Sequence, residues 1–259
     1  MRIRMAIAML GAALMTGPAI ADVTITATQQ GKGMMAKAMT GEAVTRIKGG
    51  KMRGDTATSD GPTSTLIDLD AQMMAVLNHK AKEATVTDLT DLQAAMGKMT
   101  NNNVKATVTP TGRRQEVAGR GCEVYQVEMT VPAFADPSSP ITVTTSGPVC
   151  IVKDSPGKAD YAAFYLKAAE KGFVIGGDPR QAKAQPGQAR SMTEVYRQMA
   201  RLGVPYLVEL DIKMGGEGPM GMMMGRLGFG FTSTVTRVSV EAIPDAMMAV
   251  PSDYKVKKN

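Results

Sequence analysis

Apolar and polar residues alternate along much of the chain, which is the pattern of half-buried β-strands. Residues 204–213 show it most clearly, because an apolar side chain stands at every even position from Val204 to Ile212. The same alternation in residues 122–131 puts on one face Tyr125, Val127, Met129 and Val131. Similar runs predict further strands over residues 23–28, 43–48, 52–56, 64–69, 73–78, 83–87, 104–109, 115–117, 141–152 and 229–243.

Two of the connections between these runs carry turn signals. Gly49-Gly50 separates residues 43–48 from residues 52–56, and two glycines between alternating segments favour a tight hairpin. A short acidic connection at residues 70–72 separates the next pair of runs. Strands joined by such short turns predict an antiparallel meander.

Three other segments have apolar residues at helical spacing, namely residues 92–99, 159–171 and 191–202. Ser191 is followed by Glu194 three positions later, a capping box that predicts the start of the last helix. Gly172 predicts the end of the helix before it. Residues 176–189, rich in glycine, proline and glutamine, predict a loop between the two.

These elements predict an α+β fold with one large sheet. Large antiparallel sheets usually curl, and helices with an apolar face must cover something. We therefore expect a large curved antiparallel sheet or incomplete β-barrel covered by about three helices. The chain of 259 residues is long enough for one substantial core, and we place a single domain over residues 22–259.

The N-terminus, residues 1–21, has the organisation of a secretory signal peptide. Arg2 and Arg4 form a basic start, an apolar run follows, and Ala19-Ile20-Ala21 provides small residues for cleavage after Ala21. A membrane anchor is the alternative, but the apolar run is shorter than the roughly 20 residues that span a bilayer. We therefore predict an exported, periplasmic protein without a membrane span after cleavage.

The charge distribution argues against nucleic acid as a partner. The chain carries 30 basic and 24 acidic residues, a net charge of +6 that falls by two when the signal peptide is removed. The basic residues are scattered, and no basic stripe is interleaved with aromatic residues. We interpret the basic tail, residues 255–258, as solvated; weak attraction to an anionic lipid surface is the alternative.

The two cysteines, Cys122 and Cys150, lie in separate strand-like runs. An even pair in an exported protein usually forms a disulfide, which would stabilise the fold by roughly 3–4 kcal/mol on the chain-entropy model. A reactive thiol pair is the alternative, but the spacing is not that of a Cys-x-x-Cys motif. We therefore expect a structural disulfide.

A methionine-rich segment is the sharpest candidate for metal chemistry. Thioether sulfur binds Cu(I) in exported proteins, and the segment contains Met214, Met220, Met222, Met223 and Met224. Its many glycines favour flexibility over fixed ligand geometry, so a flexible hairpin end that dips its methionines into the barrel or a membrane surface is the preferred interpretation.

Neither the remaining polar motifs nor the known catalytic patterns predict an enzyme or a cofactor. Asp68 and Asp70 have the spacing of a hard-cation site, but two carboxylates beside a hairpin are more often turn residues. His79, the single histidine, stands in a polar turn and is interpreted as a surface residue. The sequence has no nucleophile elbow, no Walker motif, and no Gly-x-Gly-x-x-Gly placed between a predicted strand and a predicted helix.

Several segments resemble a bacterial family known as domain of unknown function 4412. The segments are residues 47–53 (IKGGKMR), 67–70 (IDLD), 76–78 (VLN), 117–125 (VAGRGCEVY) and 250–255 (VPSDYK). The resemblance as a whole spans most of the chain after residue 21. That family is similar in organisation to the exported lipoprotein-carrier (LolA-like) fold, an unclosed β-barrel covered by helices that shelters acyl chains. The resemblance implies a carrier and no catalytic residues.

We therefore expect a non-catalytic binding or carrier protein for a lipid or other apolar small molecule. Its 22 methionines suit a flexible ligand, although methionines also simply fill cores. The expected ligand-lining residues are Tyr125, Val127, Met129, Tyr161, Tyr165, Met199, Tyr206, Val208 and Leu210. The alternatives are a structural envelope protein with a filled barrel and methionine-based Cu(I) binding.

Overall fold

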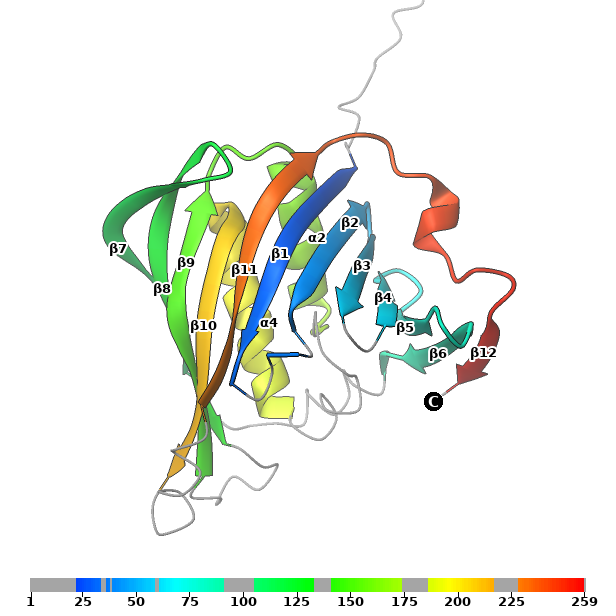
Figure 1. Cartoon of the computed structure of the whole chain (residues 1–259), viewed down its shortest axis with the longest axis horizontal. Helices are drawn as coiled ribbons and strands as arrows, with labels where there is room; N and C mark the ends of the chain where they lie inside the picture. The colour runs from blue at the N-terminus through cyan, green and yellow to red at the C-terminus, as the bar shows by residue number, and fades with distance from the viewer. Residues whose placement is uncertain are drawn as a thin grey trace, which may run out of the picture.

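The computed structural model describes residues 22–33, 36–37, 39–58, 61–90, 105–132, 141–173, 186–216 and 228–258. In these residues twelve strands form one sheet (Figure 1). The strands are β1 (Val23–Lys32), β2 (Gly41–Lys48), β3 (Lys51–Thr58), β4 (Gly61–Asp68), β5 (Met73–Asn78), β6 (Glu83–Asp88), β7 (Lys105–Val117), β8 (Arg120–Pro132), β9 (Ile141–Val152), β10 (Val204–Gly216), β11 (Gly228–Ser239) and β12 (Lys255–Lys258). The helices are α2 (Lys158–Glu170), α4 (Pro186–Leu202) and the short 3-10 helix η2 (Asp245–Met248).

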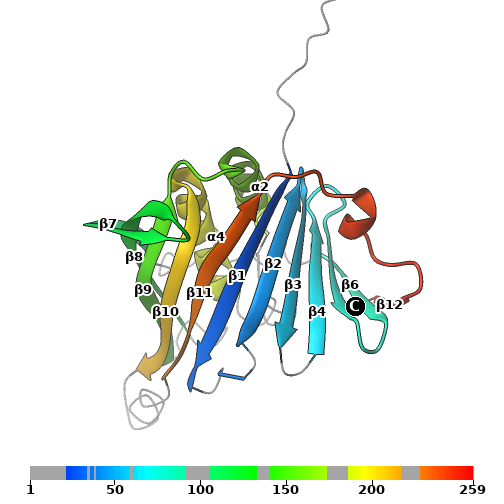
Figure 2. The ribbon, with the colours of Figure 1, turned by 45° about the horizontal axis from the view of Figure 1, so that its top comes forward.

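The sheet consists of two meanders, β1 to β6 and β7 to β11, joined where β1 pairs antiparallel with β11. It does not close, because β7 and β12 remain at its two edges. The sheet nevertheless curls, since β7 contacts β11 although three strands separate them. Both α-helices lie on one side of it (Figure 2). We call the side that they cover the inner face and the opposite side the outer face. The predicted curved, open antiparallel sheet is confirmed.

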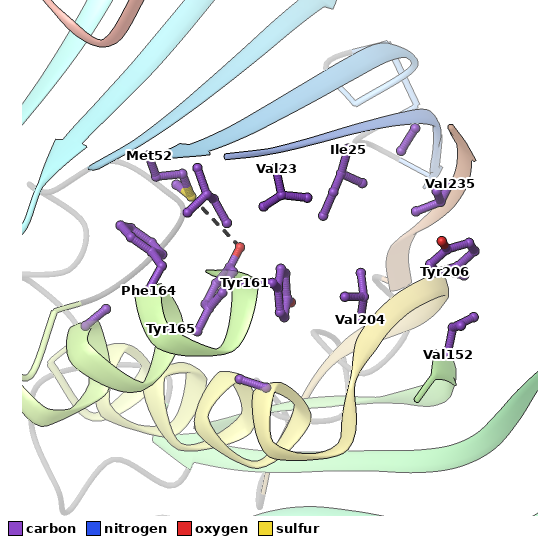
Figure 3. Packing of buried hydrophobic residues seen from close by; sticks show 14 of the residues in the cluster. Val23, Ile25, Met52, Val152, Tyr161, Phe164, Tyr165, Val204, Tyr206 and Val235 are labelled. Atoms are coloured by element: carbon purple, nitrogen blue, oxygen red, sulfur yellow. Dashed lines mark hydrogen bonds between the residues drawn. The ribbon is translucent and has the colours of Figure 1, made fainter. Parts of the chain in front are cut away.

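The inner face packs densely against α2. Phe164 is completely buried, and Tyr161 and Tyr165 lie beside it with their rings directed toward the sheet (Figure 3). The Tyr165 hydroxyl lies 3.9 Å from the sulfur of Met52 on β3. Burial raises the pKa of Tyr165 far above its ordinary value, so this phenol stays neutral. Aromatic side chains therefore fill this half of the interior.

The outer face is crossed by residues 240–254, which we call the C-terminal strap. It leaves the end of β11, passes β1 to β3 and brings the chain to β12 at the far edge (Figures 1 and 2). Three hydrogen bonds fix its first half: Ile243 N–H donates to Asp22 (2.6 Å), Lys48 donates to Ile243 O (2.6 Å), and Arg53 donates to Met247 O (2.9 Å). The strap therefore ties the first strands of the chain to the last one.

The second half of the strap covers a separate apolar cluster. Val250 and Tyr254 pack against the outer-face cluster formed by Leu66, Ala75, Leu77 and Ala84. Beyond Tyr254, β12 pairs parallel with β6, and Lys257 forms an ion pair of 2.6 Å with Glu83. The side chains of residues 255–258 are exposed, as expected for solvated basic residues, but the segment is not a free tail, because its backbone adds an edge strand to the sheet.

Two strand predictions need correction. Residues 104–109 and 115–117 were predicted as separate strands, but β7 is continuous with an irregularity between Pro110 and Arg114. Proline lacks the N–H of a ladder bond, and the left-handed Gly112 (φ 76°) lets the chain bulge and resume pairing. The strand predicted over residues 229–243 ends at Ser239, because the chain then turns away as the C-terminal strap.

The start of α4 was also predicted wrongly. The helix begins at Pro186, so the last residues of the predicted loop at 176–189 are helical and Ser191 lies inside the helix. Proline suits a first helical turn because its missing N–H has no helical partner there. Glu194, the supposed capping residue, instead accepts hydrogen bonds from Arg197 and Gln198.

The end of α2 follows the prediction. Gly172 is left-handed (φ 67°), and the N–H groups of Gly172 and Phe173 donate to the carbonyls of Ala169 and Ala168, which is the Schellman arrangement. Two α-helices are present in the described residues, against the three predicted; the segment 92–99 lies outside them, as does the predicted signal peptide, residues 1–21.

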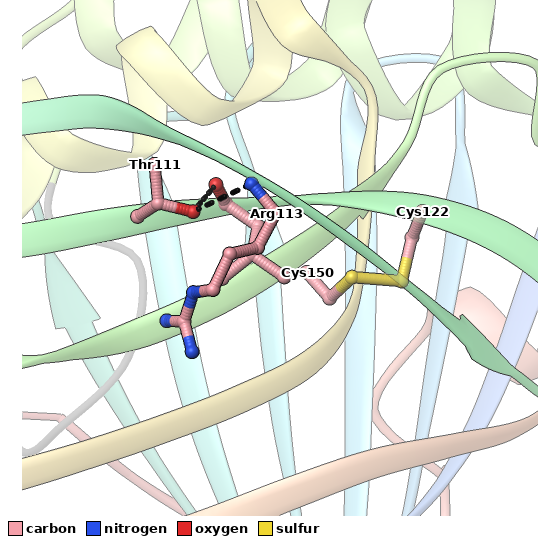
Figure 4. The surroundings of a disulfide bond; sticks show 5 residues. Thr111, Arg113, Cys122 and Cys150 are labelled. Carbon is pink, nitrogen blue, oxygen red and sulfur yellow. Dashed lines mark hydrogen bonds between the residues drawn. A yellow bond between two sulfur atoms is a disulfide. The ribbon is translucent and has the colours of Figure 1, made fainter.

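Cys122 and Cys150 form a disulfide between β8 and β9, with Cα atoms 5.5 Å apart (Figure 4). The two cysteines are diagonal neighbours, since Cys150 pairs in register with Val124. Nearby, the hydroxyl of Thr111 donates to Val124 O (2.7 Å) and accepts from Arg113 N–H (3.3 Å), which stabilises the bulge in β7. The predicted disulfide is confirmed.

Candidate apolar binding site

An apolar cavity of about 180 Å³ lies between α4 and the inner face of the sheet. It sits in the curled half of the molecule, and Tyr196 separates it from the aromatic side chains of α2. Its lining residues come from one helix and from β1, β8, β9, β10 and β11, and are Gln29, Val127, Met129, Thr145, Val149, Met192, Val195, Tyr196, Met199, Pro205, Val208, Leu210, Phe231 and Ser233.

The helical side of the cavity follows from the spacing of residues in α4. Met192, Val195 and Met199 stand three and four positions apart, which puts them on one face of a helix. Val195 and Met199 are almost fully buried. Two flexible thioether side chains at this wall can adapt to ligands of different shape.

Two contacts fix α4 over the sheet. The side-chain amide of Gln198 accepts a hydrogen bond from Val108 N–H (3.1 Å) and lies 3.4 Å from Ala106 O, so it caps the edge strand β7 as a neighbouring strand would. The ring of Tyr196 stacks on that of Tyr165 with centroids 5.3 Å apart. One edge of α4 is therefore tied to the sheet and the other to α2.

The chemistry of the lining is apolar and uncharged. None of the lining residues carries a charge, and those with a polar group are Gln29, Thr145, Tyr196 and Ser233. Burial raises the pKa of Tyr196 above its ordinary value, so its phenol is neutral at physiological pH. Such a wall favours hydrocarbon and has few groups that would hold an ionic headgroup.

The size of the cavity limits what fits inside it. An apolar cavity of roughly 150 Å³ holds a benzene molecule, and sites for drug-sized ligands measure roughly 300–1,000 Å³. A volume of about 180 Å³ therefore matches a small hydrocarbon or a short stretch of an acyl chain. A whole lipid chain requires α4 to move outward.

Five of the nine residues predicted to line a ligand site lie around this cavity: Val127, Met129, Met199, Val208 and Leu210. The four tyrosines in the prediction lie elsewhere. Tyr161 and Tyr165 fill the core under α2, Tyr206 is buried with its hydroxyl 3.1 Å from Ser155, and Tyr125 donates to Glu123 (3.1 Å). Their hydroxyl groups have partners within the protein, and their rings fill the interior and do not line the cavity.

The sequence prediction missed other lining residues. Met192 and Val195 share the helical spacing that pointed to Met199, so this signal was available. Gln29 and Phe231 carried no such signal, because they meet only through the pairing of β1 with β11, strands more than 200 positions apart in the chain. A contact of that kind is set by the topology of the whole sheet.

The candidate metal ligands do not gather in the described residues. Met214 lies on β10, partly buried in an apolar cluster with Met129 and Ile141, and Met220, Met222, Met223 and Met224 lie outside the described residues. No group of three His, Cys, Asp or Glu that would hold a metal ion occurs in the part of the chain that the structure describes.

Asp68 and Asp70 are turn residues, as the sequence indicates. The Asp68 carboxylate accepts the N–H groups of Asp70 (3.0 Å) and Ala71 (2.9 Å), and Asp70 pairs with Lys167 at 2.6 Å. Burial alone would raise the pKa of Asp68, but these hydrogen bonds and the ammonium of Lys51 lower it overall.

His79 lies in the predicted turn, but it is not a free surface residue. It is a partly buried residue whose Nε2 lies 2.6 Å from Ser64 Oγ and whose Nδ1 lies 2.5 Å from the Tyr254 hydroxyl. Ser64 also donates to Asp55, so the serine stands between the carboxylate and the imidazole. A catalytic triad needs the imidazole in the middle, and Ser64 is only 1% exposed. We interpret this cluster as an anchor for the C-terminal strap.

Fold and cavity together define a class: an open antiparallel sheet with helices on its inner face and an apolar hollow beneath one of them. Residues 32–132 match the family model described as Domain of unknown function (DUF4412). The predicted family resemblance is thereby confirmed over those residues, although the match stops well short of the predicted motif at 250–255. No curated protein matches the chain.

Several solved structures show a weak overall likeness. An uncharacterized conserved protein from Thermus thermophilus has 9% identity and a TM-score of 0.39, covering 93% of this chain and 92% of that one. The Mycobacterium tuberculosis lipoprotein LppX has 11% identity and a TM-score of 0.36, covering 87% and 90%. A LolA superfamily protein from Nitrosomonas europaea has 6% identity and a TM-score of 0.27, covering 89% and 91%.

In the described residues, no helix combines the length and the apolar character that crossing a membrane requires.

Proposed function

We propose that this protein is an exported, non-catalytic binding or carrier protein for an apolar ligand, held between α4 and the inner face. One observation carries the proposal: the cavity of about 180 Å³ is lined without any charged side chain. A helix covers it, and three methionines, Met129, Met192 and Met199, contribute to its wall. The signal-peptide pattern at residues 1–21 supports the periplasmic location.

The competing function is that of a structural protein whose interior is filled by its own side chains. The packing under α2 favours this function. The aromatic side chains there belong to one large cluster of buried residues. The two functions differ in whether the cavity under α4 takes up hydrocarbon from solution. Binding of uncharged hydrocarbon chains is therefore the measurement that separates them.

The test uses calorimetric titration of the purified protein, without its signal peptide, with primary alcohols from butanol to decanol. Each buried methylene contributes about 0.8 kcal/mol, so affinity rises about fourfold per carbon until the cavity is full. Beyond that length the affinity of a cavity under a fixed α4 stays constant. A continued rise to decanol indicates that α4 moves outward and that longer acyl chains are accepted.

Two substitutions at one position test the location. Val195 is 3% exposed and lines the cavity from α4, so Val195→Phe fills it and should end the rise at a shorter alcohol. Val195→Ala enlarges it and should extend the rise to a longer one. Val256→Phe, at a side chain 53% exposed on β12, is the matched control and should behave as the unchanged protein.

Absence of alcohol binding, or equal binding by Val195→Phe and the unchanged protein, would refute the proposal and favour the structural function. Native mass spectrometry of protein purified from its own periplasm, followed by extraction, then identifies the natural ligand.

A further inference from the structure

A second cavity, of about 250 Å³, lies on the outer face, opposite the apolar one. Its floor is formed by β1, β2 and β11 and its wall by the C-terminal strap. The lining residues are Thr24, Thr26, Arg46, Arg237, Ser239, Glu241, Ala242, Ile243, Pro244 and Met247. The predicted ligand site on the inner face includes none of them.

The floor gathers groups that donate hydrogen bonds to an anion. Thr24 pairs in register with Arg46 on one side and Ser239 on the other, and Thr26 pairs with Arg237. Side chains of residues directly opposite each other on neighbouring strands lie on the same face with Cβ atoms about 4.5–5.5 Å apart. Two guanidinium groups and three hydroxyl groups therefore line one patch of sheet.

Within the lining itself, two arginines stand against one acidic residue. Arg46 is paired with Asp55, but that carboxylate also accepts from Arg53 and Ser64, so it serves two arginines. Arg46 retains further N–H donors, because a guanidinium has five. Arg237 is exposed and has no acidic partner among the described residues. Glu241, exposed at the rim, is the single acidic residue of the lining.

The wall of this cavity is apolar and held in place. Pro244 and Met247 face the cavity from the strap, and Met247 is 44% exposed, one of the few large apolar side chains on the described surface. Hydrogen bonds from Lys48 and Arg53 to the strap's carbonyl groups keep this wall over the floor. A cationic floor beside an apolar wall suits a ligand that carries both kinds of group.

We propose that this outer cavity binds a phosphate or carboxylate group through Arg237, Arg46 and the hydroxyl groups between them, with Met247 and Pro244 contacting any attached apolar chain. Both groups are oxyanions, and the site would recognise the oxyanion itself. Its source is either a free anion in solution or the headgroup of a small amphiphile, and the experiment distinguishes the two.

The test is calorimetric titration at low salt with inorganic phosphate and with hexyl phosphate. We expect saturable 1:1 binding. Arg237→Gln should weaken it at least about tenfold, since a hydrogen bond to a charged group is lost. Glu241→Gln should strengthen it about two- to fivefold, because a like charge near the anion is removed. Arg113→Gln removes the same charge from an exposed position on β7 and should change nothing.

The two probes separate the sources of the anion. Tighter binding of hexyl phosphate identifies an amphiphile, and equal binding of both probes identifies a free anion; either result supports the site. Val195→Phe is titrated in parallel, because loss of hexyl phosphate binding there would place the ligand in the inner cavity and overturn the proposal.

Absence of saturable binding would also overturn it, as would equal losses in Arg237→Gln and Arg113→Gln. If Arg237→Gln does not fold, the strengthening by Glu241→Gln and a weakening by the isosteric Thr26→Val decide the question.

Discussion

Replacing Ser64 with alanine tests the hydrogen bonds that anchor the C-terminal strap. Ser64 is 1% exposed, and its hydroxyl donates to Asp55 while it accepts from Arg53 (3.1 Å) and His79 (2.6 Å). The alanine variant leaves these donors and the carboxylate without their common partner. The loss of these partly buried hydrogen bonds, two of them to charged groups, costs about 1–3 kcal/mol.

The assay is urea unfolding followed by circular dichroism, together with thermal unfolding. For a protein of this size each kcal/mol lowers the Tm by about 2–4 °C, so Ser64→Ala should lower the Tm by about 2–12 °C. Ser146→Ala is the matched control, a partly exposed strand serine whose substitution should stay within about 0.5 kcal/mol. A Ser64→Ala variant as stable as this control would refute the anchoring interpretation.

The stability difference between Ser64→Ala and the unchanged protein should depend on pH, because Ser64 donates to the carboxylate of Asp55. Burial would raise the pKa of Asp55, but the hydrogen bonds from Ser64 and Arg53 and the charge of Arg46 lower it overall. A lowered folded-state pKa stabilises the protein above the unfolded-state pKa of about 3.9 and ceases to do so as pH falls through the folded value. The stability difference between Ser64→Ala and the unchanged protein should therefore be largest at neutral pH and decrease below about pH 4. A constant difference between pH 7 and pH 2.5 would contradict this account of Asp55.

Three further predictions concern stability. Reduction of the Cys122–Cys150 disulfide, which closes a loop of 28 positions, should lower the free energy of unfolding by about 3–4 kcal/mol, as measured by urea unfolding with and without reductant. Phe164→Ala, at a completely buried side chain, should cost about 3–5 kcal/mol in the same assay. Gly147→Ala should cost about 1–3 kcal/mol, because the added Cβ meets the carbonyl oxygen of Glu209, whereas Gly121→Ala, with open space around it, should be tolerated.

Much of the sheet follows from local pattern because its inner face is buried. On β8 the alternation predicted from Tyr125 to Val131 matches the buried positions, since a period of two maps directly onto an inner and an outer side. The Gly49-Gly50 turn works for an equally local reason: Gly49 is left-handed (φ 56°), a conformation that glycine adopts without strain.

Elements held by polar or distant contacts could not be predicted in this way. All four side chains of β12 are exposed, so the residues from Lys255 to Lys258 show no apolar pattern and pair only because the strap delivers them to β6. The anchor of His79 depends on Tyr254, 175 positions away. The hydrophobic pattern of a single segment contains no information about such a partner.

At the candidate site, too, one feature could be predicted from the sequence and another could not: the two helices could, but not which of them borders a cavity. Both α2 and α4 have apolar residues at helical spacing, and this pattern alone does not separate a helix that fills the interior from one that leaves space. The difference lies in the side chains: Tyr161, Phe164 and Tyr165 occupy the space under α2 with rigid rings, whereas Val195 and Met199 border the cavity under α4. If the proposed function is correct, exchanging side chains on the α4 face should therefore change ligand uptake while leaving the sheet and the α2 core intact.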